Sequence, residues 1–333
     1  MFSTKFKSFN RDKIAKIILA LFLLFLIICL SIFPDKYSKS TFNGIALFAV
    51  SVLPSLLPYF FLTAILSRLN VLSCFLKKFD NFTSKVFRIN GYSAYAFFMS
   101  ILSGYPVGSK IVYELHSNNL ISDSESSRLS LLSSTSGPLF IIGAVGSTMF
   151  ESKTCGVIIY IAHVLSAVLT CLIFRKSGTP SKMLKNYDLA NKSDGVLYES
   201  IYSAVISCLI VGGFVSVFFV ISQILIDFKI LYPLSLLFNS ILAPLSSANE
   251  GLALAVGLIE FTNGSKMLSL IATNSLTVSL SCFIITFGGI SGILQSLVFL
   301  NKANVKSSFF ILGKVIQATI AFVLCYFTCY FFL

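Results

Sequence analysis

Two polar stretches interrupt long apolar runs and carry side chains that could bind a ligand. The first, residues 103–110, reads Ser-Gly-Tyr-Pro-Val-Gly-Ser-Lys, and the second, residues 260–266, reads Glu-Phe-Thr-Asn-Gly-Ser-Lys. Each ends in Gly-Ser-Lys, follows an apolar run too short to cross a bilayer comfortably, and precedes an apolar run that ends in clustered glycines. Polar breaks at matching places in two halves of a hydrophobic chain point to a binding site near the middle of a membrane transporter.

The breaks predict a polar site built from hydroxyls, amides and one carboxylate. Helices that end inside a membrane leave backbone groups without partners and partial charges of about half an electron at their tips. The side chains at the breaks could bind a polar solute, or they could only satisfy the backbone and neighbouring helices. The predicted substrate-binding residues are Ser103, Gly104, Tyr105, Pro106, Ser136, Glu260, Thr262, Asn263, Ser291 and Gln295. The predicted structural hinges are Gly108, Gly137, Pro138, Gly264, Gly288 and Gly289.

The charged residues within or beside the apolar runs differ in what they predict. Glu260 cannot extend as far toward the headgroups as a lysine, so we expect its carboxylate to face a polar cavity. Lys110 and Lys266 can reach the membrane surface with their long side chains. Glu250 is expected near an interface, and His163 is expected to be a hydrogen-bonded packing residue. Neither a nucleophile–base set nor a glycine-rich phosphate loop is visible, so the sequence predicts no enzyme activity and no catalytic residue.

The composition predicts a protein that crosses a lipid bilayer several times. Of the 333 residues, 56% are hydrophobic and 11% are charged, whereas an ordinary soluble domain carries about 25% charged residues. The net charge of +12 comes from basic clusters between apolar runs, which favours a topology signal over nucleic-acid binding. The eight cysteines are dispersed, so they predict packing residues and neither a metal site nor a disulfide framework.

The apolar runs divide the chain into five units. Full spans are expected at residues 14–33, 44–66, 155–174, 203–226, 267–289 and 309–333, and a re-entrant hairpin over residues 92–116. Pro54 and Pro58 should kink the second span, an amphipathic helix is expected over residues 68–88, and Ser122 should begin a helix. The predicted units are an N-terminal transmembrane helix (1–40), a first repeat (41–174), a cytoplasmic basic linker (175–197), a second repeat (198–300) and a C-terminal transmembrane helix (301–333).

The distribution of basic residues orients these units in the membrane. Basic clusters place the N-terminus, residues 67–90 and residues 175–192 in the cytoplasm. The first hairpin then enters the membrane from the cytoplasm and the second enters from outside. The predicted fold is therefore an all-α polytopic membrane protein with two inverted repeats, each containing a re-entrant helical hairpin and broken helices.

Several motifs resemble those of the YlbJ-type sporulation integral membrane proteins of endospore-forming bacteria. They lie at residues 53–58 (Leu-Pro-Ser-Leu-Leu-Pro), 103–110, 136–145 (Ser-Gly-Pro-Leu-Phe-Ile-Ile-Gly-Ala-Val), 257–264 and 287–295. The resemblance covers nearly the whole chain. It implies membership of the nucleoside-recognition Gate domain group, with two Gate-like repeats, and a role in endospore formation at the cortex-forming stage, in a membrane of the sporulating cell.

A more remote resemblance concerns the proposed site. Residues 259–261 (Ile-Glu-Phe) are similar to the Asn-Glu-Phe-Val motif of concentrative nucleoside transporters, and residues 287–295 are similar to their Gly-Phe-Ala-Asn-Phe-Ser-Ser-x-x-x-Gln segment. This likeness implies that Glu260 faces the ligand and that Ser291 lies near it. The chain has Gly289 where those transporters have a ligand-binding Asn, and Ser-Gly-Tyr-Pro where they have Gly-Gln-Thr-Glu. The likeness therefore extends further to architecture than to nucleoside specificity.

The expected function is transporter-like movement of a small polar solute through a site between two opposed hairpins. A coupling ion, Na⁺ or H⁺, would fit such a mechanism, and no other cofactor or metal is expected. The alternative is a non-transporting membrane scaffold for spore cortex assembly. The expected partners are the lipid bilayer, the solute, and further copies of the chain or other sporulation membrane proteins.

Overall fold

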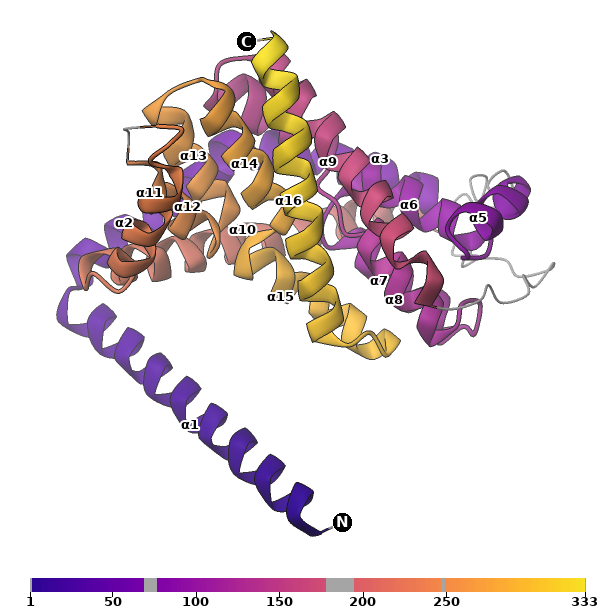
Figure 1. Cartoon of the computed structure of the whole chain (residues 1–333), viewed down its shortest axis with the longest axis horizontal. Coiled ribbons are helices and arrows are strands. Elements are labelled where there is room, and N and C mark those ends of the chain that lie inside the picture. Colours follow the sequence, from indigo (N-terminus) through magenta and orange to yellow (C-terminus); the bar gives the residue numbers. More distant parts are fainter. Residues whose placement is uncertain (1, 69–76, 178–194, 247–248, 333) are drawn as a thin grey trace.

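The computed structural model describes residues 2–68, 77–177, 195–246 and 249–332. All regular structure in these ranges is helical, which confirms the predicted all-α class (Figure 1). The first half contains α1 (Phe2–Ile32), α2 (Pro34–Leu47), the π-helical segment η1 (Phe48–Val52), α3 (Leu53–Arg68), α5 (Asp80–Val86), α6 (Tyr92–Ser103), α7 (Val107–Ser117), α8 (Asp123–Leu132), the π-helical segment η3 (Leu139–Met149) and α9 (Lys153–Ile173). The second half contains α10 (Val196–Asp227), α11 (Tyr232–Leu242), α12 (Glu250–Gly257), α13 (Phe261–Ile271), α14 (Ser275–Phe287), α15 (Gly289–Leu300) and α16 (Ser307–Phe332).

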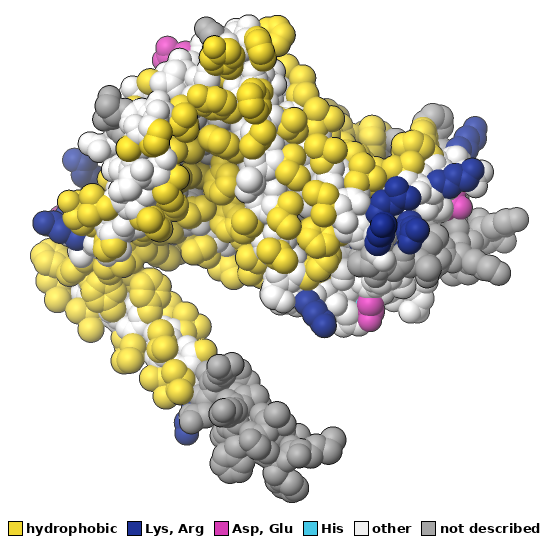
Figure 2. Space-filling view, in the orientation of Figure 1, with side chains coloured by type: hydrophobic (Ala, Val, Ile, Leu, Met, Phe, Trp, Pro, Cys, Tyr) yellow, Lys and Arg dark blue, Asp and Glu magenta, His cyan; other side chains and the backbone are white. Residues whose placement is uncertain are grey.

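The length and hydropathy of the helices confirm a multi-pass membrane protein. Within the described ranges, five segments are long and apolar enough to cross a bilayer, or up to six if a bent pair is one span; the five are Lys13–Ile32, Lys153–Lys176, Val196–Asp227, Ser275–Ala303 and Ser307–Phe332. Only 11% of the first of these spans is buried inside the protein. Figure 2 shows hydrophobic side chains over most of the visible face, with lysines and arginines gathered mainly at one side. A bilayer is the solvent that suits this surface.

The predicted second span is a bent pair of helices. Pro34–Val52 and Leu56–Leu66 meet at an angle of 59°, and Pro54 lies in the break, as predicted. Proline removes a backbone donor and its ring obstructs the preceding turn, so a helix bends where it occurs. The helix begins at Pro34, earlier than the predicted residue 44. Proline is favoured in the first turn of a helix because its fixed φ angle is already helical.

Both Gly-Ser-Lys breaks form helical hairpins. Helices α6 and α7 pack together and are joined by a turn at residues 104–106, and α12 and α13 pack together and are joined at residues 258–260. In each hairpin the Gly-Ser-Lys sequence lies near the start of the second helix. At Gly264 a Cβ atom would lie 2.3 Å from the Cα of Gly257, so only glycine allows the two arms to approach this closely.

Two further interruptions follow the hairpins. Residues 133–137, between α8 and η3, are not helical, as the Ser-rich sequence indicated. Between α14 and α15 the chain turns at Gly288 and Gly289, whose φ angles are +88° and +58°. Both angles lie in the left-handed region that glycine adopts without steric penalty. Of the predicted hinges, Gly288 and Gly289 lie at this turn, and Gly137 lies in the non-helical segment.

The predicted continuous span over residues 267–289 is wrong. Helix α13 ends at Ile271, Ala272 is extended with φ −166° and ψ 162°, and α14 begins at Ser275. The side-chain oxygen of Asn274 accepts hydrogen bonds from the backbone amides of Leu276 (3.0 Å) and Thr277 (2.9 Å). An asparagine N-cap of this kind begins a new helix, and hydropathy averaged over a long window does not detect it.

The two halves share one interior. Helix α16 packs against both α9 and α14, and α3 packs against α10. The second arm of each hairpin contacts the opposite half, because α7 packs against α15 and α13 packs against η3. Figure 1 shows α16 crossing the body of the molecule and α1 extending away from it. Each hairpin therefore packs against the other half of the chain as well as against its own half.

Some predictions fall partly outside the described residues. Residues 69–76 of the predicted amphipathic helix and residues 178–194 of the predicted basic linker are not described. Of the cysteines, Cys74 lies outside these ranges, and the other seven are buried free thiols, as expected of packing residues. Ser122 begins α8 as predicted, because its hydroxyl and the Glu125 carboxylate form a reciprocal capping box.

Candidate functional site

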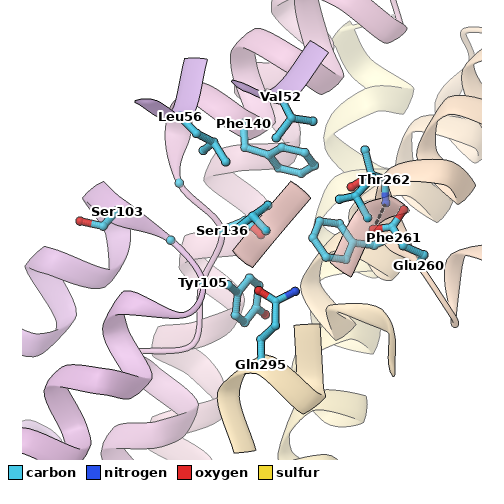
Figure 3. Close-up of a pocket in the computed structure, with 14 residues that line it drawn as sticks. Val52, Leu56, Ser103, Tyr105, Ser136, Phe140, Glu260, Phe261, Thr262 and Gln295 are labelled. Carbon is cyan, nitrogen blue, oxygen red and sulfur yellow. Dashed lines mark hydrogen bonds between the residues drawn. The ribbon is translucent and has the colours of Figure 1, made fainter. Parts of the chain in front are cut away.

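A cleft lies where the tips of the two hairpins meet the interrupted segment after α8 (Figure 3). It contains about 460 Å³ of empty space, part of which is open to the outside. Its walls come from η1, α3, α10 and α15 as well as from the hairpin turns. The lining residues are Val52, Leu56, Ser103, Gly104, Tyr105, Ser136, Gly137, Phe140, Val211, Val215, Glu260, Phe261, Thr262 and Gln295.

Seven of the ten residues predicted to bind substrate line this one cleft. They are Ser103, Gly104, Tyr105, Ser136, Glu260, Thr262 and Gln295. The other three lie beside it without lining it: Pro106 in the first hairpin turn, Asn263 in the first turn of α13, and Ser291 in the first turn of α15. Among the predicted hinges, Gly137 lines the cleft, Pro138 begins η3, and Gly108 and Gly264 lie inside α7 and α13.

Glu260 has a structural role at the tip of the second hairpin in addition to its place in the cleft wall. It is completely buried and is the N-cap of α13. Its Oε1 accepts a hydrogen bond from the backbone amide of Thr262 (3.1 Å), and its Oε2 accepts one from the amide of Asn263 (2.7 Å). The positive end of the helix dipole stabilises a carboxylate at this position. The Thr262 side chain also hydrogen-bonds to this carboxylate, and because a carboxylate has about four lone-pair sites, capacity for a ligand remains.

Three other polar groups of the lining have no hydrogen-bond partner among the described residues. They are the hydroxyls of Ser103 and Ser136 and the side-chain carbonyl oxygen of Gln295, all buried. Leaving a buried polar group unpaired costs about 1–3 kcal/mol. Figure 3 shows the Gln295 side chain extending from α15 toward the hairpin tips that carry Tyr105 and Phe261. These groups make the cleft suitable for a molecule that can donate and accept hydrogen bonds.

Aromatic side chains join the two hairpins across the cleft. Phe261, from the second hairpin, lies 6.4 Å from the Tyr105 ring of the first hairpin and 5.5 Å from the ring of Phe140, measured between centroids. The Phe140 contact is edge-to-face, with an angle of 84° between the ring planes, a favourable arrangement for aromatic pairs. This apolar part of the lining was not predicted, because it brings together residues far apart in the sequence.

Comparison with known proteins gives one informative match. The chain is 27% identical over 335 residues to the sporulation integral membrane protein YlbJ of Bacillus subtilis, and the alignment covers 94% of this chain and 82% of that protein. This similarity supports a YlbJ-type assignment. No protein-family model matches the chain, and no solved structure matches it. The helical, multi-pass character of the structure agrees with the description of the relative as an integral membrane protein.

The interrupted segment beside the cleft is fixed by buried side chains from other helices. The Ser100 hydroxyl of α6 donates to the backbone oxygen of Ser133 (2.5 Å). His163 of α9 accepts a hydrogen bond at Nε2 from the amide of Ser136 (2.9 Å), and its Nδ1 is 2.8 Å from the Thr286 hydroxyl. Because Nε2 is an acceptor, neutral His163 carries its proton on Nδ1 and donates to Thr286. His163 is therefore the hydrogen-bonded packing residue that the sequence indicated.

Lys314 is a site residue that the sequence reasoning missed. It lies on α16 and is completely buried. Its Nζ donates hydrogen bonds to the Tyr105 hydroxyl (2.6 Å), the backbone oxygen of Ser134 (2.9 Å) and the Gln317 Oε1 (3.1 Å). A signal was present, because Lys314 and Gln317 are three residues apart in an apolar run and share a helix face. Charges in the middle of a membrane helix are rare and usually functional.

The lysines of the Gly-Ser-Lys breaks are placed differently. Lys110 is half-exposed and forms an ion pair with Glu114 at 3.8 Å, and Lys266 is partly buried. Neither lines the cleft. Glu250, which the sequence places near a membrane interface, is the first residue of α12; it is 1% exposed and accepts a hydrogen bond from the Ser246 hydroxyl at 2.6 Å.

Proposed function

We propose that this chain is a transporter-like membrane protein of endospore formation that binds and moves a small polar solute through the cleft. The observation that carries the proposal is the meeting of both hairpin tips at one cleft whose lining holds unpartnered polar groups. The proposed activity is not enzymatic. By resemblance to the sporulation relative, it would operate at the cortex-forming stage, in a membrane of the sporulating cell.

Contacts at one end of the molecule support the orientation of the first hairpin. The Asn304 side-chain amide donates to the Asp123 carboxylate (3.3 Å), which brings the loop before α16 to the start of α8. Arg175 donates to the backbone oxygen of Lys85 (3.2 Å), which brings the end of α9 to the segment before α6. The base of the first hairpin and three basic segments are thus gathered at one end. By the distribution of basic residues this end is cytoplasmic in our proposal.

The base of the second hairpin lies toward the other end. The Cys282 thiol of α14 is 3.7 Å from the backbone oxygen of Ala321, midway along α16. Ser279, earlier in α14, hydrogen-bonds to Cys325, later in α16, so the beginning of α14 lies toward the C-terminal end of α16. Helix α13 ends immediately before α14 begins. The two hairpins would then enter from opposite sides and meet at their tips. This arrangement is the one that an inverted repeat with alternating access requires.

In the proposed cycle, the hairpin tips open alternately to the two sides of the membrane. The Tyr105–Phe261 contact would separate and re-form as the halves rock about the cleft. Glu260 would serve a double purpose, holding the first turn of α13 and presenting a negative charge to the solute or to a coupling cation. The hydroxyls of Ser103 and Ser136 would exchange hydrogen bonds with the solute, and the Gln295 Oε1 would accept one from it. These bonds would offset the free-energy cost of burying the three groups without partners.

A labelling experiment tests whether the cleft opens to both sides. Thr262→Cys places a thiol in the cleft with little change in volume, in a parent chain that also carries Cys74→Ser. A membrane-impermeant maleimide is applied to right-side-out and to inside-out vesicles. Transport predicts labelling in both preparations, whereas a non-transporting scaffold predicts labelling from one side or from neither. Ser281→Cys is the matched control, because Ser281 is completely buried and outside the cleft.

A second experiment examines Glu260 in sporulating cells. Glu260→Asp keeps both the charge and an effective N-cap, whereas Glu260→Gln removes the charge. We expect the aspartate variant to support spore formation and the glutamine variant to fail at normal protein level and membrane placement. Full spore formation by the glutamine variant would argue against the proposed site.

A further inference from the structure

The oxygens around Lys314 form a small cage with a consistent chemistry. Its Nζ has three hydrogen-bonding protons, and these point to the phenol oxygen of Tyr105, the backbone oxygen of Ser134 and the amide oxygen of Gln317, at 2.6, 2.9 and 3.1 Å. The Nζ also lies 5.2 Å from the centroid of the Tyr105 ring. No acidic side chain of the described residues is within ion-pair distance of it. Within the described residues, the oxygens that the lysine nitrogen contacts are therefore all neutral.

This donor set is the kind that binds a monovalent cation. Backbone carbonyls freed where a membrane helix is interrupted coordinate Na⁺ or similar ions, and neutral carbonyl oxygens replace their hydration shell. Ser134 supplies such a carbonyl, because residues 133–137 are not helical. The same geometry excludes an anion, since all three protons of the Lys314 ammonium are already engaged.

The side chain of Gln317 contributes an acceptor oxygen to the cage. Its Oε1 faces Nζ, and its buried Nε2 then has no hydrogen-bond partner among the described residues. The opposite orientation of the amide would direct its nitrogen at the ammonium. The amide therefore presents its acceptor oxygen to the lysine nitrogen, while its own nitrogen stays unpaired among the described residues.

The cage joins three elements at the edge of the cleft. Tyr105 belongs to the tip of the first hairpin and lines the cleft, Ser134 belongs to the interrupted segment, and Lys314 belongs to α16. Helix α16 is held closely at this level, because a Cβ at Gly313 would lie 2.3 Å from the Leu131 side chain of α8. Whatever cation occupies the cage therefore fixes the first hairpin tip against the interrupted segment.

We propose that this cage is a monovalent-cation site, and that the Lys314 ammonium occupies it as a covalently attached cation in place of a dissolved ion. The first hairpin tip is then fixed against the interrupted segment without Na⁺ or another dissolved cation at this position. Removing the side chain while leaving the oxygens should create a site for a small free cation. This inference goes beyond the proposed function, because it holds whether or not the cleft moves a solute.

The test compares the thermal stability of the purified full chain with that of two variants in three salts of equal ionic strength: sodium chloride, methylammonium chloride and choline chloride. We expect the wild-type melting temperature to be the same in all three. In choline chloride, Lys314→Ala should melt several degrees below the wild type, because choline is too large for the cage. In sodium or methylammonium chloride its melting temperature should rise toward that of the wild type. Lys314→Met should melt lower in all three salts, because the methionine side chain fills the space without charge.

Three results would overturn the proposal: Lys314→Met as stable as wild type, Lys314→Ala with no response to either small cation, or an equal response to sodium by the wild type. If the Lys314 variants do not accumulate, the neighbouring glutamine provides a test with the lysine in place. Gln317→Glu should melt at or above the wild-type temperature because it pairs with the ammonium, and Gln317→Leu should melt below it. If Gln317→Glu and Gln317→Leu lower the melting temperature equally, the cage does not hold a cation.

Discussion

Replacing Gly108 by alanine tests the packing of the first hairpin against the interrupted segment. A Cβ atom at this position would lie 1.8 Å from the backbone oxygen of Ser133 and 2.6 Å from the hydroxyl of Ser100. Carbon and oxygen normally approach to about 3.3 Å, so the helix or the segment must move by roughly 1.5 Å. The movement would also break the hydrogen bond between Ser100 and Ser133. Gly213 on α10 is the matched control, because a Cβ there meets nothing within 4 Å.

Opposing terms set the expected magnitude. Alanine is favoured over glycine in a helix by about 1 kcal/mol, and this gain applies to both variants. Overpacking a tight interior contact costs about 1–3 kcal/mol, and the lost hydrogen bond costs about 0.5–1.5 kcal/mol. The net expectation for Gly108→Ala is a destabilisation of about 0.5–3.5 kcal/mol. Gly213→Ala should be neutral or stabilise the protein by up to about 1 kcal/mol.

The assay is thermal unfolding of the purified chain in detergent or in lipid nanodiscs, with both variants prepared in parallel. Gly108→Ala should melt below the wild type, and Gly213→Ala should melt at or above it. Equal melting temperatures for the two variants would refute the close packing of α7 on the interrupted segment. If Gly108→Ala lowers the melting temperature less than expected and the cells still form spores normally, the interrupted segment moves to accept the methyl group without disturbing the cleft.

Three further predictions concern the base of the first hairpin, which we propose is cytoplasmic, and the orientation of the chain. Ser122→Ala removes the capping box of α8 and should lower the unfolding free energy by about 1 kcal/mol, measured by thermal unfolding; an unchanged midpoint would show that the cap is dispensable. The hydrogen bond with His116 lowers the pKa of Asp123 below its usual value, so the stabilisation from Asp123 is present above about pH 4 and lost as the pH falls further. Melting temperatures between neutral and strongly acidic pH should therefore fall more steeply for the wild type than for Asp123→Asn, and parallel curves would contradict this. Cysteines at Lys302 and Lys229 should be labelled from the cytoplasmic and the opposite side respectively, and labelling of both from one side would disprove the proposed orientation.

Local sequence signals predicted the hairpins because glycine and proline act on the backbone directly. The Gly-Ser-Lys repeats and Ser-Gly-Tyr-Pro marked both turns, and Ser122 marked the start of α8. The break at Asn274 was missed because one capping residue determines it, while the flanking residues keep the average hydropathy high. Signals of this kind are visible only when each polar residue in an apolar run is examined as a possible helix start.

Much of the polar part of the candidate cleft could be predicted, but its apolar wall and its buried cation could not. Tyr105 and Glu260 lie at the breaks that define the hairpins, so a search for breaks finds them. Phe140 and Val211 come from separate helices and look like any other core residue in the sequence. Lys314 lies on the last helix, away from both breaks, and its role depends on contacts that only the packing of α16 against α8 and the first hairpin creates.

The position of His163 has a consequence for how the two interruptions behave together. One ring nitrogen binds the amide of Ser136 in the first interruption, and the other binds Thr286, two residues before the second interruption begins at Gly288. A rigid ring between two hydrogen bonds transmits displacement in either direction. Neither interruption can therefore shift by more than a fraction of an ångström without pulling on the other or breaking a buried bond, which makes the imidazole a mechanical link between the two halves of the chain.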